Sequence, residues 1–181
     1  MTKRSTWMPR TADSPESADA DRSASGKEPL PVRLRRAAMD ALARREHSFA
    51  ELTRKLRTKF PDAPEEQIGQ QLGRLREQGL QSDARFTEAY VRYRKTRGFA
   101  YLHIRADLLG RGVCQTLIEE HLFLDDEDWF SMAEELVAKR VLGEQDLSFG
   151  GKPHRKLLRF LESRGFPPAI SRRVLDSRFG R

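Results

Sequence analysis

One apolar frame occurs three times along this 181-residue chain and limits the folds that it can adopt. Each copy has two aliphatic residues four positions apart, a closing residue four positions further on, and a basic residue just before the close. Apolar residues at this spacing form the buried stripe of an amphipathic helix. The copies span 52–60, 104–112 and 157–165, and their penultimate residues are Lys59, Arg111 and Arg164.

A second correspondence supports a tandem repeat. Leu80, Phe86 and Ala89 recur with an offset of 44 residues as Leu124, Phe130 and Ala133. A unit of three short helices is too small to bury a robust core alone, and stacking in tandem supplies the missing contacts. The sequence therefore predicts an all-α fold, an elongated and curved tandem array of three three-helix repeats.

Helix signals are frequent, whereas alternating strand patterns are nearly absent. Ser48 and Glu51 form a capping box, and glycines stand where helices should stop, at Gly79, Gly98, Gly112 and Gly165. These signals predict helices at 33–46, 48–60, 64–78, 83–97, 100–110, 113–122, 127–141, 152–163 and 168–178.

The composition changes near Pro31. Residues 1–31 are rich in Ser, Ala and Asp and are predicted to form a disordered tail, because they contain few groups that could be buried. The repeats are expected at 32–80, 81–124 and 125–181.

Charge is divided into blocks along the chain. Residues 31–111 carry 18 basic and 10 acidic side chains, residues 112–148 carry 2 and 10, and residues 149–181 carry 9 and 2. Two basic regions thus flank an acidic one, which favours a polyanion or an acidic protein surface as partner. A soluble helical protein with unevenly distributed charge is the plainer explanation.

Three sets of cations are candidate partner- or nucleic-acid-binding residues. Comparable placement on stacked units would form a basic stripe, which suits an extended polymeric partner. The candidates are Arg54, Lys55, Arg57 and Lys59; Arg92, Arg94, Lys95, Arg97, Arg105 and Arg111; and Lys152, Arg155, Lys156 and Arg159.

The stretch 83–97 allows two interpretations. Its aromatic residues follow helical spacing with Ala89, so Phe86, Tyr90 and Tyr93 are expected in the core rather than as base-stacking platforms. Its cations could simply complement the helix dipole. That effect accounts for one or two of them, and the others leave a binding role open.

Catalytic patterns are weak. The four histidines lack metal-ligand spacing and are expected to pack or to cap helices, and Cys114 is expected to be buried. The acidic run 125–128 is better explained as the start of a helix than as a calcium loop. We therefore predict no enzyme, no metal and no cofactor. The single cysteine and the absence of a long apolar run indicate a cytoplasmic protein without membrane contact.

Three segments together resemble the RecX family of bacterial recombination regulators. They are REHSFAELTRKL at 45–56, GLQSDARF at 79–86, and RGF at 97–99 followed by IRADL at 104–108. The resemblance covers roughly 33–179. Gln81 and Ser82 replace a pair that is more often aliphatic or acidic in the family, and the tail lies outside the resemblance.

The resemblance implies a modulator that is not an enzyme. RecX proteins look like curved arrays of three-helix repeats. They lie in the groove of the filament that the RecA recombinase forms on single-stranded DNA, and there they usually oppose filament growth, strand exchange and ATP hydrolysis. The expected partners are the RecA filament and, as a further candidate, single-stranded DNA. The expected roles are in recombination, DNA repair and the SOS response, and the expected state is a monomer.

Two alternatives stay open at this point. The three-helix units could act as helix-turn-helix readers of duplex DNA, although the basic helices lack an evident base-reading set. A general helical scaffold would depend on neither RecA nor DNA.

Overall fold

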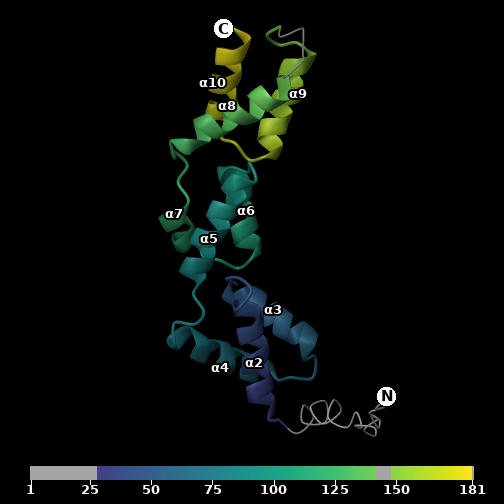
Figure 1. The fold of residues 1–181 in the computed structure, drawn as a ribbon, viewed down its shortest axis with the longest axis vertical. Helices are drawn as coiled ribbons and strands as arrows, with labels where there is room; N and C mark the ends of the chain where they lie inside the picture. Colours follow the sequence, from purple (N-terminus) through teal and green to yellow (C-terminus); the bar gives the residue numbers. More distant parts are fainter. Residues whose placement is uncertain (1–27, 142–147, 181) are drawn as a thin grey trace, which may run out of the picture.

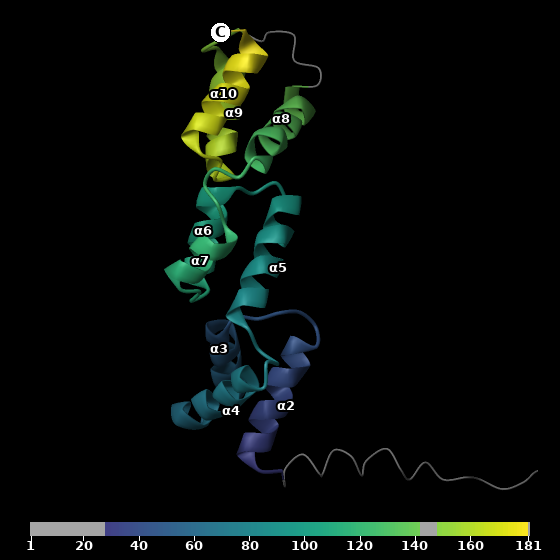
Figure 2. The same ribbon diagram turned by 90° about the vertical axis from the view of Figure 1, so that its left-hand side faces the viewer.

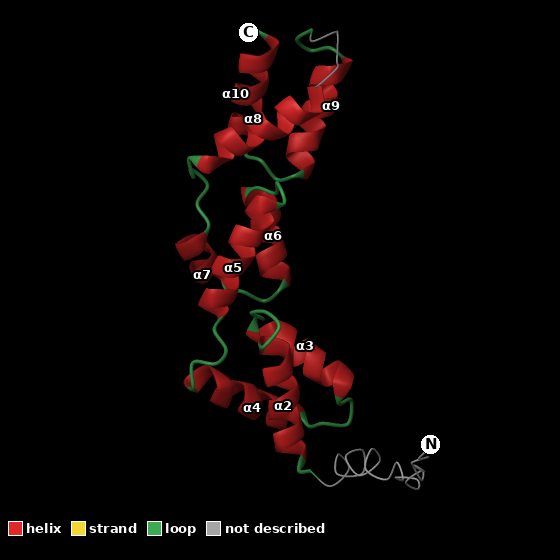
Figure 3. Cartoon of the chain, in the orientation of Figure 1, coloured by secondary structure: helices red, strands yellow, loops and turns green. Residues whose placement is uncertain are grey.

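The computed structural model describes residues 28–141 and 148–180, and every regular element within them is a helix (Figure 3). None of these helices is both long and apolar enough to cross a bilayer. The predicted all-α class is confirmed. The elements are α2 (Leu30–Leu42), α3 (Phe49–Lys59), α4 (Glu65–Glu77), α5 (Asp83–Thr96), α6 (Tyr101–Gly110), α7 (Gln115–His121), α8 (Asp128–Val141), α9 (Lys152–Ser163) and α10 (Pro168–Phe179).

The first helix lies earlier than the sequence suggested. It was expected at 33–46, and α2 instead begins at Leu30 and ends at Leu42. Pro31 is compatible with this start, because the first turn of a helix does not use its amide groups for internal hydrogen bonds. The tail predicted for 1–31 therefore overlaps α2 by two residues, and its residues 1–27 lie outside the described part of the chain.

The predicted helix boundaries at Ser48 and the glycines are confirmed. Ser48 Oγ accepts a hydrogen bond from the Glu51 amide at 3.1 Å, although the Glu51 carboxylate bonds elsewhere instead of completing the capping box. All four expected stop glycines have positive φ, from 68° at Gly79 to 81° at Gly165. This left-handed conformation ends a helix at little cost only for glycine.

Three three-helix units, α2–α4, α5–α7 and α8–α10, follow one another along an elongated, curved molecule (Figures 1 and 2). In both views the middle helices α3, α6 and α9 lie one above another. Their repeated aliphatic positions are all buried, which confirms that the apolar frame marks the core: Leu52, Leu56, Ile104, Leu108, Leu157 and Leu161.

Within the described residues, the buried side chains form two cores rather than one core per unit. One belongs to the first unit and is built around Leu34, Leu52 and Leu72. The other is continuous through the second and third units, from Phe86 to Phe179. The second and third units are therefore joined by shared apolar packing, whereas the first unit has a separate core.

Two joints connect the middle helices end to end. At the first joint, where α6 ends against the start of α3, Ser48 Oγ donates to the carbonyl of Arg111 at 2.7 Å. At the second joint, where α9 ends against the start of α6, the amides of Ala100 and Leu102 donate to the carbonyls of Arg164 and Gly165 at 2.8 and 2.9 Å. Each joint thus satisfies polar groups that a helix end leaves without partners.

Candidate partner-binding surface

The α3 cations form one exposed group. Arg54, Lys55, Arg57 and Lys59 are all exposed, because Leu52 and Leu56 turn the opposite side of the helix into the core. Within this group, Arg57 pairs with Glu65 at 2.6 Å, a surface pair of small energetic value. We call these four residues the α3 patch.

The α9 cations form a second exposed group. Leu157 and Leu161 face the core, and Arg155 donates to the carbonyl of Gly150 at 2.6 Å. The remaining side chains of the group have no ion pair within the described residues. We call this set the α9 patch: Lys152, Arg155, Lys156 and Arg159.

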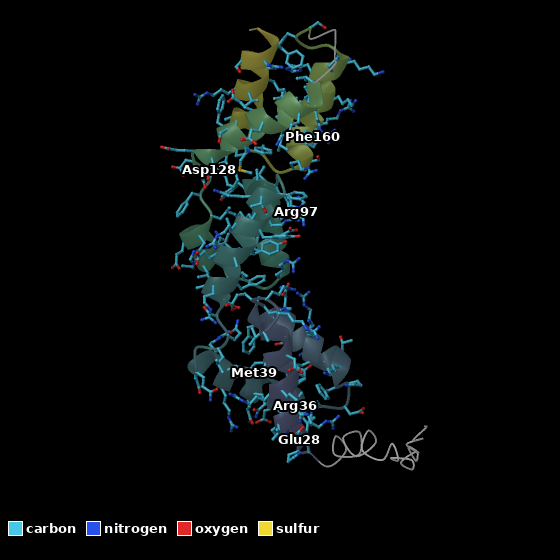
Figure 4. All side chains as sticks on the ribbon, viewed as in Figure 1. Glu28, Arg36, Met39, Arg97, Asp128 and Phe160 are labelled. Atoms are coloured by element: carbon cyan, nitrogen blue, oxygen red, sulfur yellow. The ribbon has the colours of Figure 1, made fainter. Side chains whose placement is uncertain are left out.

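The α5 cations divide into two kinds. Arg92 and Arg97 are exposed; Arg92 pairs with Glu88 one turn earlier at 2.5 Å, and Arg97 lies 5.4 Å from the centroid of the Tyr93 ring. Figure 4 places Arg97 near the second joint. These two residues remain accessible to a partner.

Arg94 is held inside the molecule. It pairs with Asp107 at 2.8 Å, and its guanidinium lies 3.8 Å from the centroid of the Phe99 ring. It also lies within 2.5 Å of His103 Nε2. Since Asp107 and His103 belong to α6, Arg94 connects α5 to the helix beside it.

Lys95 connects the second unit to the third. Its Nζ lies 2.5 Å from Asp126 and 3.0 Å from Asp128, and 4.6 Å from the Trp129 ring centroid. Burial alone would lower the pKa of Lys95, and the two carboxylates more than offset it, so the pKa is raised and the side chain stays charged. The acidic run at the start of α8, where Figure 4 labels Asp128, therefore has a structural partner.

Arg111 holds the first joint. It pairs with Glu51 of the first unit and lies 4.6 Å from the Tyr90 ring centroid. Burial opposes its charge, but bonding to Tyr90 and Glu51 outweighs burial and raises the pKa of Arg111. Arg105, by comparison, is half-buried and forms no ion pair with any described residue.

His47 and Glu51 complete the polar network of this joint. His47 is 2% exposed and its Nδ1 lies 3.0 Å from Glu51 Oε2. Burial is the main reason that the pKa of His47 is lowered, so the ring is neutral near pH 7. Burial would raise the pKa of Glu51, but hydrogen bonds from His47 and Arg45 and the charge of Arg45 lower it overall, which keeps the carboxylate ionised.

The three sets of cations do not occupy matching positions. In the repeated frame, Arg54 corresponds to Arg159 in α9 but to Ala106 in α6. The penultimate frame position is basic in all three copies, yet Arg111 and Arg164 are used at the joints, where Arg164 donates to the Arg97 carbonyl at 3.0 Å. The structure thus gathers exposed cations at α3 and at α9, separated by the length of α6 (Figure 1).

Two expectations about individual residues are wrong. In the predicted core stripe of α5, Phe86 is buried and Tyr90 is partly buried, but Ala89 and Tyr93 are exposed. The helix buries Thr87 and Val91 instead, and this choice depends on where α7 lies, which the stripe could not indicate. Cys114, expected to be buried, is exposed because it precedes α7 at the N-cap position.

Comparison with known proteins gives a consistent result. The family model described as "RecX, second three-helix domain" matches residues 82–122. Proteins named "Regulatory protein RecX" from Pseudomonas entomophila and Pseudomonas savastanoi pv. phaseolicola are 40% and 41% identical to this chain. They cover 82% and 83% of it, and the matches span 93% and 94% of their own lengths. The chain belongs to the RecX family.

Solved structures of RecX proteins show the same fold. The RecX from Lactobacillus salivarius has a TM-score of 0.70 at 23% identity, covering 81% of this chain and 95% of that one. A second structure, of a regulatory protein RecX, has a TM-score of 0.68 at 22% identity, covering 89% of this chain and 80% of that one. The Pseudomonas relatives and the second solved structure are named as regulatory proteins, not as enzymes. In the part of the chain that the structure describes, no group of acidic, histidine and cysteine side chains could hold a metal ion.

Proposed function

We propose that this protein binds the filament that RecA forms on single-stranded DNA and restrains its ATP hydrolysis and strand exchange. Membership of the RecX family supports a regulatory role, and the family resemblance implies RecA as the target. Through that target the protein would limit recombination and the SOS response in the cytoplasm.

The observation that carries the proposal is the distance between the α3 and α9 patches. End-to-end stacking of α3, α6 and α9 sets the two patches in the first and third units of one elongated molecule (Figure 2). A filament presents the same surface on successive subunits, so two spaced patches can engage two subunits at once. Linked contacts raise the apparent affinity well above that of either contact alone.

Charge supports the same target. The exposed lysines and arginines of the patches suit acidic protein surface or the phosphates of DNA. Asp125 and Glu127, which are exposed beside α8, suit basic protein surface and would fix the orientation of the protein in the groove.

The test reverses the charge of exposed cations only, and compares patch variants with a control variant. Arg94, Lys95 and Arg111 are left unchanged, because reversing their charge would also break contacts inside the protein. One variant carries Arg54→Glu and Lys55→Glu in the α3 patch, and another carries Lys152→Glu and Lys156→Glu in the α9 patch. The control carries Arg44→Glu and Arg172→Glu, two exposed cations outside both patches with the same total change in charge.

RecA's ATPase on single-stranded DNA is titrated with each protein. We expect the parent protein to inhibit it, each patch variant to require roughly tenfold more protein, as for the loss of about 1.4 kcal/mol of binding, and the control to match the parent. Circular dichroism confirms that each variant is folded. Full inhibition by a folded patch variant would exclude that patch, and no inhibition by the parent at any ratio would overturn the function. Binding to free single-stranded and duplex DNA is measured in parallel, and tight sequence-selective binding to duplex alone would favour the helix-turn-helix alternative.

A further inference from the structure

An open hollow of about 420 Å³ lies at the first joint, on the side of α3 that carries Arg54 and Arg57. Its apolar wall combines Phe49, at the start of α3, with Leu109, near the end of α6, and Leu109 is 41% exposed. A volume of this size falls within the range of small-molecule sites, so it accommodates one aromatic side chain. We call it the joint hollow, and it takes an apolar group that has negative charges nearby.

Exposed cations continue from the joint hollow along α3 to the first helix. Arg54 lines the joint hollow and, on its other side, a shallow depression that also contains Lys55. Lys59, at the end of α3, lines a groove together with Arg33 and Arg36 of α2. One basic track therefore runs from α2 across α3 to the joint hollow.

The N-terminal segment, residues 1–27, joins the described structure at the start of this track. Glu28 lines the same groove as Lys59 and pairs with Arg36. A chain of roughly 20 residues, the separation of Trp7 from Glu28, can extend to about 65 Å. Helix α3 has 11 residues and is therefore about 16 Å long. Trp7 is thus within reach of the joint hollow.

The sequence of the N-terminal segment complements the track in charge and in order. Between residues 11 and 21 it has no basic side chain and four acidic ones: Asp13, Glu16, Asp19 and Asp21. Its large apolar pair, Trp7 and Met8, lies beyond these acids when the chain is followed away from Glu28. Cations followed by an apolar hollow on the body therefore match acids followed by an apolar pair on the segment. Arg4 and Arg10 are three positions from Trp7, far enough to stay in water.

A tethered contact of this kind needs little affinity of its own. A short flexible linker gives an effective concentration on the order of 1 mM, so a contact with a Kd of about 1 mM would already be half occupied. Exposed charge pairs contribute little individually, and partial burial of an indole ring adds to them. An acidic peptide of another protein would have the same chemistry but would lack the tether.

We propose that the N-terminal segment folds back over α3, with its acids along the basic track and Trp7 in the joint hollow. The segment then covers the α3 patch, and any partner of that patch must displace it. The contact itself does not depend on the proposed function; only its effect on RecA does.

The test uses the fluorescence of Trp7 in the full-length protein, obtained by subtracting the spectrum of Trp7→Phe from that of the parent. A synthetic peptide of residues 1–27 gives the spectrum of the free segment. Leu109→Ser removes the apolar wall of the joint hollow. Leu102→Ser is its matched control, because Leu102 is 47% exposed on the same helix and lies outside the hollow. Each variant is also made with Trp7→Phe for its own subtraction.

A second pair of variants tests the charges. The acid variant carries Asp13→Asn, Glu16→Gln, Asp19→Asn and Asp21→Asn. Its control changes the total charge equally by replacing with glutamine four exposed glutamates of α7 and α8, which are Glu119, Glu120, Glu134 and Glu135.

We expect Trp7 of the parent to emit at shorter wavelength than the free peptide and to be quenched less by acrylamide, because the indole leaves water. Leu109→Ser and the acid variant should return both readings to those of the peptide. Leu102→Ser and the glutamine control should match the parent. On RecA's ATPase, the acid variant should inhibit at about half the concentration that the parent requires, as for a patch that is half covered.

Parent spectra that match the free peptide would overturn the inference. A shift that depends on protein concentration would also overturn it, because the segment would then occupy a second copy of the chain. A shift that survives in the acid variant would exclude the basic track. If the parent failed to inhibit RecA while Trp7 responded as expected, the proposed function would be wrong and this contact would stand, so the two proposals can fail separately.

Discussion

Single atoms decide how closely the second and third units approach. At the second joint, Gly165 has a φ of 81° and packs against the backbone of His103 at the start of α6. A methyl group at Gly165 would overlap the His103 backbone nitrogen, which cannot move without shifting α6. Glycine is therefore required here for both its conformation and its size.

We expect Gly165→Ala to destabilise the protein by about 3 kcal/mol or more, because the strain of a positive φ and a backbone overlap add together. Gly79→Ala is the matched control, since Gly79 has a φ of 68° but nothing within 4 Å of an added methyl group. It should cost about 1 kcal/mol, from the conformational strain alone. Urea denaturation followed by circular dichroism measures both, and equal losses would show that the close approach is not needed.

The sequence predicts single residues well where the signal is local. Ser48 as a helix cap and Gly79 as a helix stop were predicted because their partners lie within a few positions of the chain. The role of Arg111 was not predictable in this way, because its partner Glu51 lies 60 residues earlier. Spacing alone could not show that Arg111 holds a joint rather than facing a binding partner.

At the scale of the helices, the two joints differ in chemistry: the joint that connects the first unit is polar, whereas the joint between the second and third units is apolar. The first joint is formed by polar contacts, such as Arg85 with Glu46 at 2.8 Å and the Phe49 amide with Asp83 at 2.8 Å. The second joint lies within a continuous apolar core. Apolar burial contributes more to cooperative folding than polar contacts, whose net gain is reduced by the loss of hydration, so the first unit has the weaker coupling.

We expect the first unit to unfold at a lower urea concentration than the other two. Trp129 is fully buried in the shared core of the upper units, so its fluorescence reports on them alone once Trp7 is replaced by Phe. Circular dichroism reports on all helices and should show an additional transition before the fluorescence changes. Coincident curves from the two probes would show instead that the chain unfolds as one cooperative unit.

Periodicity in the sequence predicts that a helix forms, but it does not predict which neighbours pack against that helix. The 3.6-residue pattern identified α5 correctly, because the pattern depends on the chain itself. It misassigned Ala89 and Tyr93, because the buried side of α5 is set by α6 and α7, which approach it from later in the sequence. The exposure of Ala89 and Tyr93 therefore became visible only in the structure.

At the scale of the whole molecule, the two outer ends of the stack of middle helices lack the groups that form the joints. At the second joint, the amide of Ala100 donates a hydrogen bond to the carbonyl of Arg164 at the end of α9. The corresponding position in α9 is Pro153, which has no amide hydrogen to donate. At the other extremity, Phe60 replaces the closing glycine of the later copies and has a φ of −131°. Neither extremity can repeat the contacts of the joints with a second copy of the chain.

We therefore expect the protein to be a monomer with a mass of 20.9 kDa by light scattering during size-exclusion chromatography. The mass should not depend on concentration, because no exposed extremity can continue the stack. A mass that rises with concentration would contradict this prediction. In that case, a Phe60→Gly variant would test whether the first extremity is the contact, and it should then associate more strongly than the parent.

The polar first joint also determines where the molecule can adapt its curvature. Of the ion pairs at this joint, Arg85 with Glu46 is partly exposed, so it can exchange for water at little net cost and added salt screens it. The apolar contacts above it resist bending under the same conditions. We therefore expect any bending of the molecule to take place at the first joint, with the second and third units moving together because they share one core.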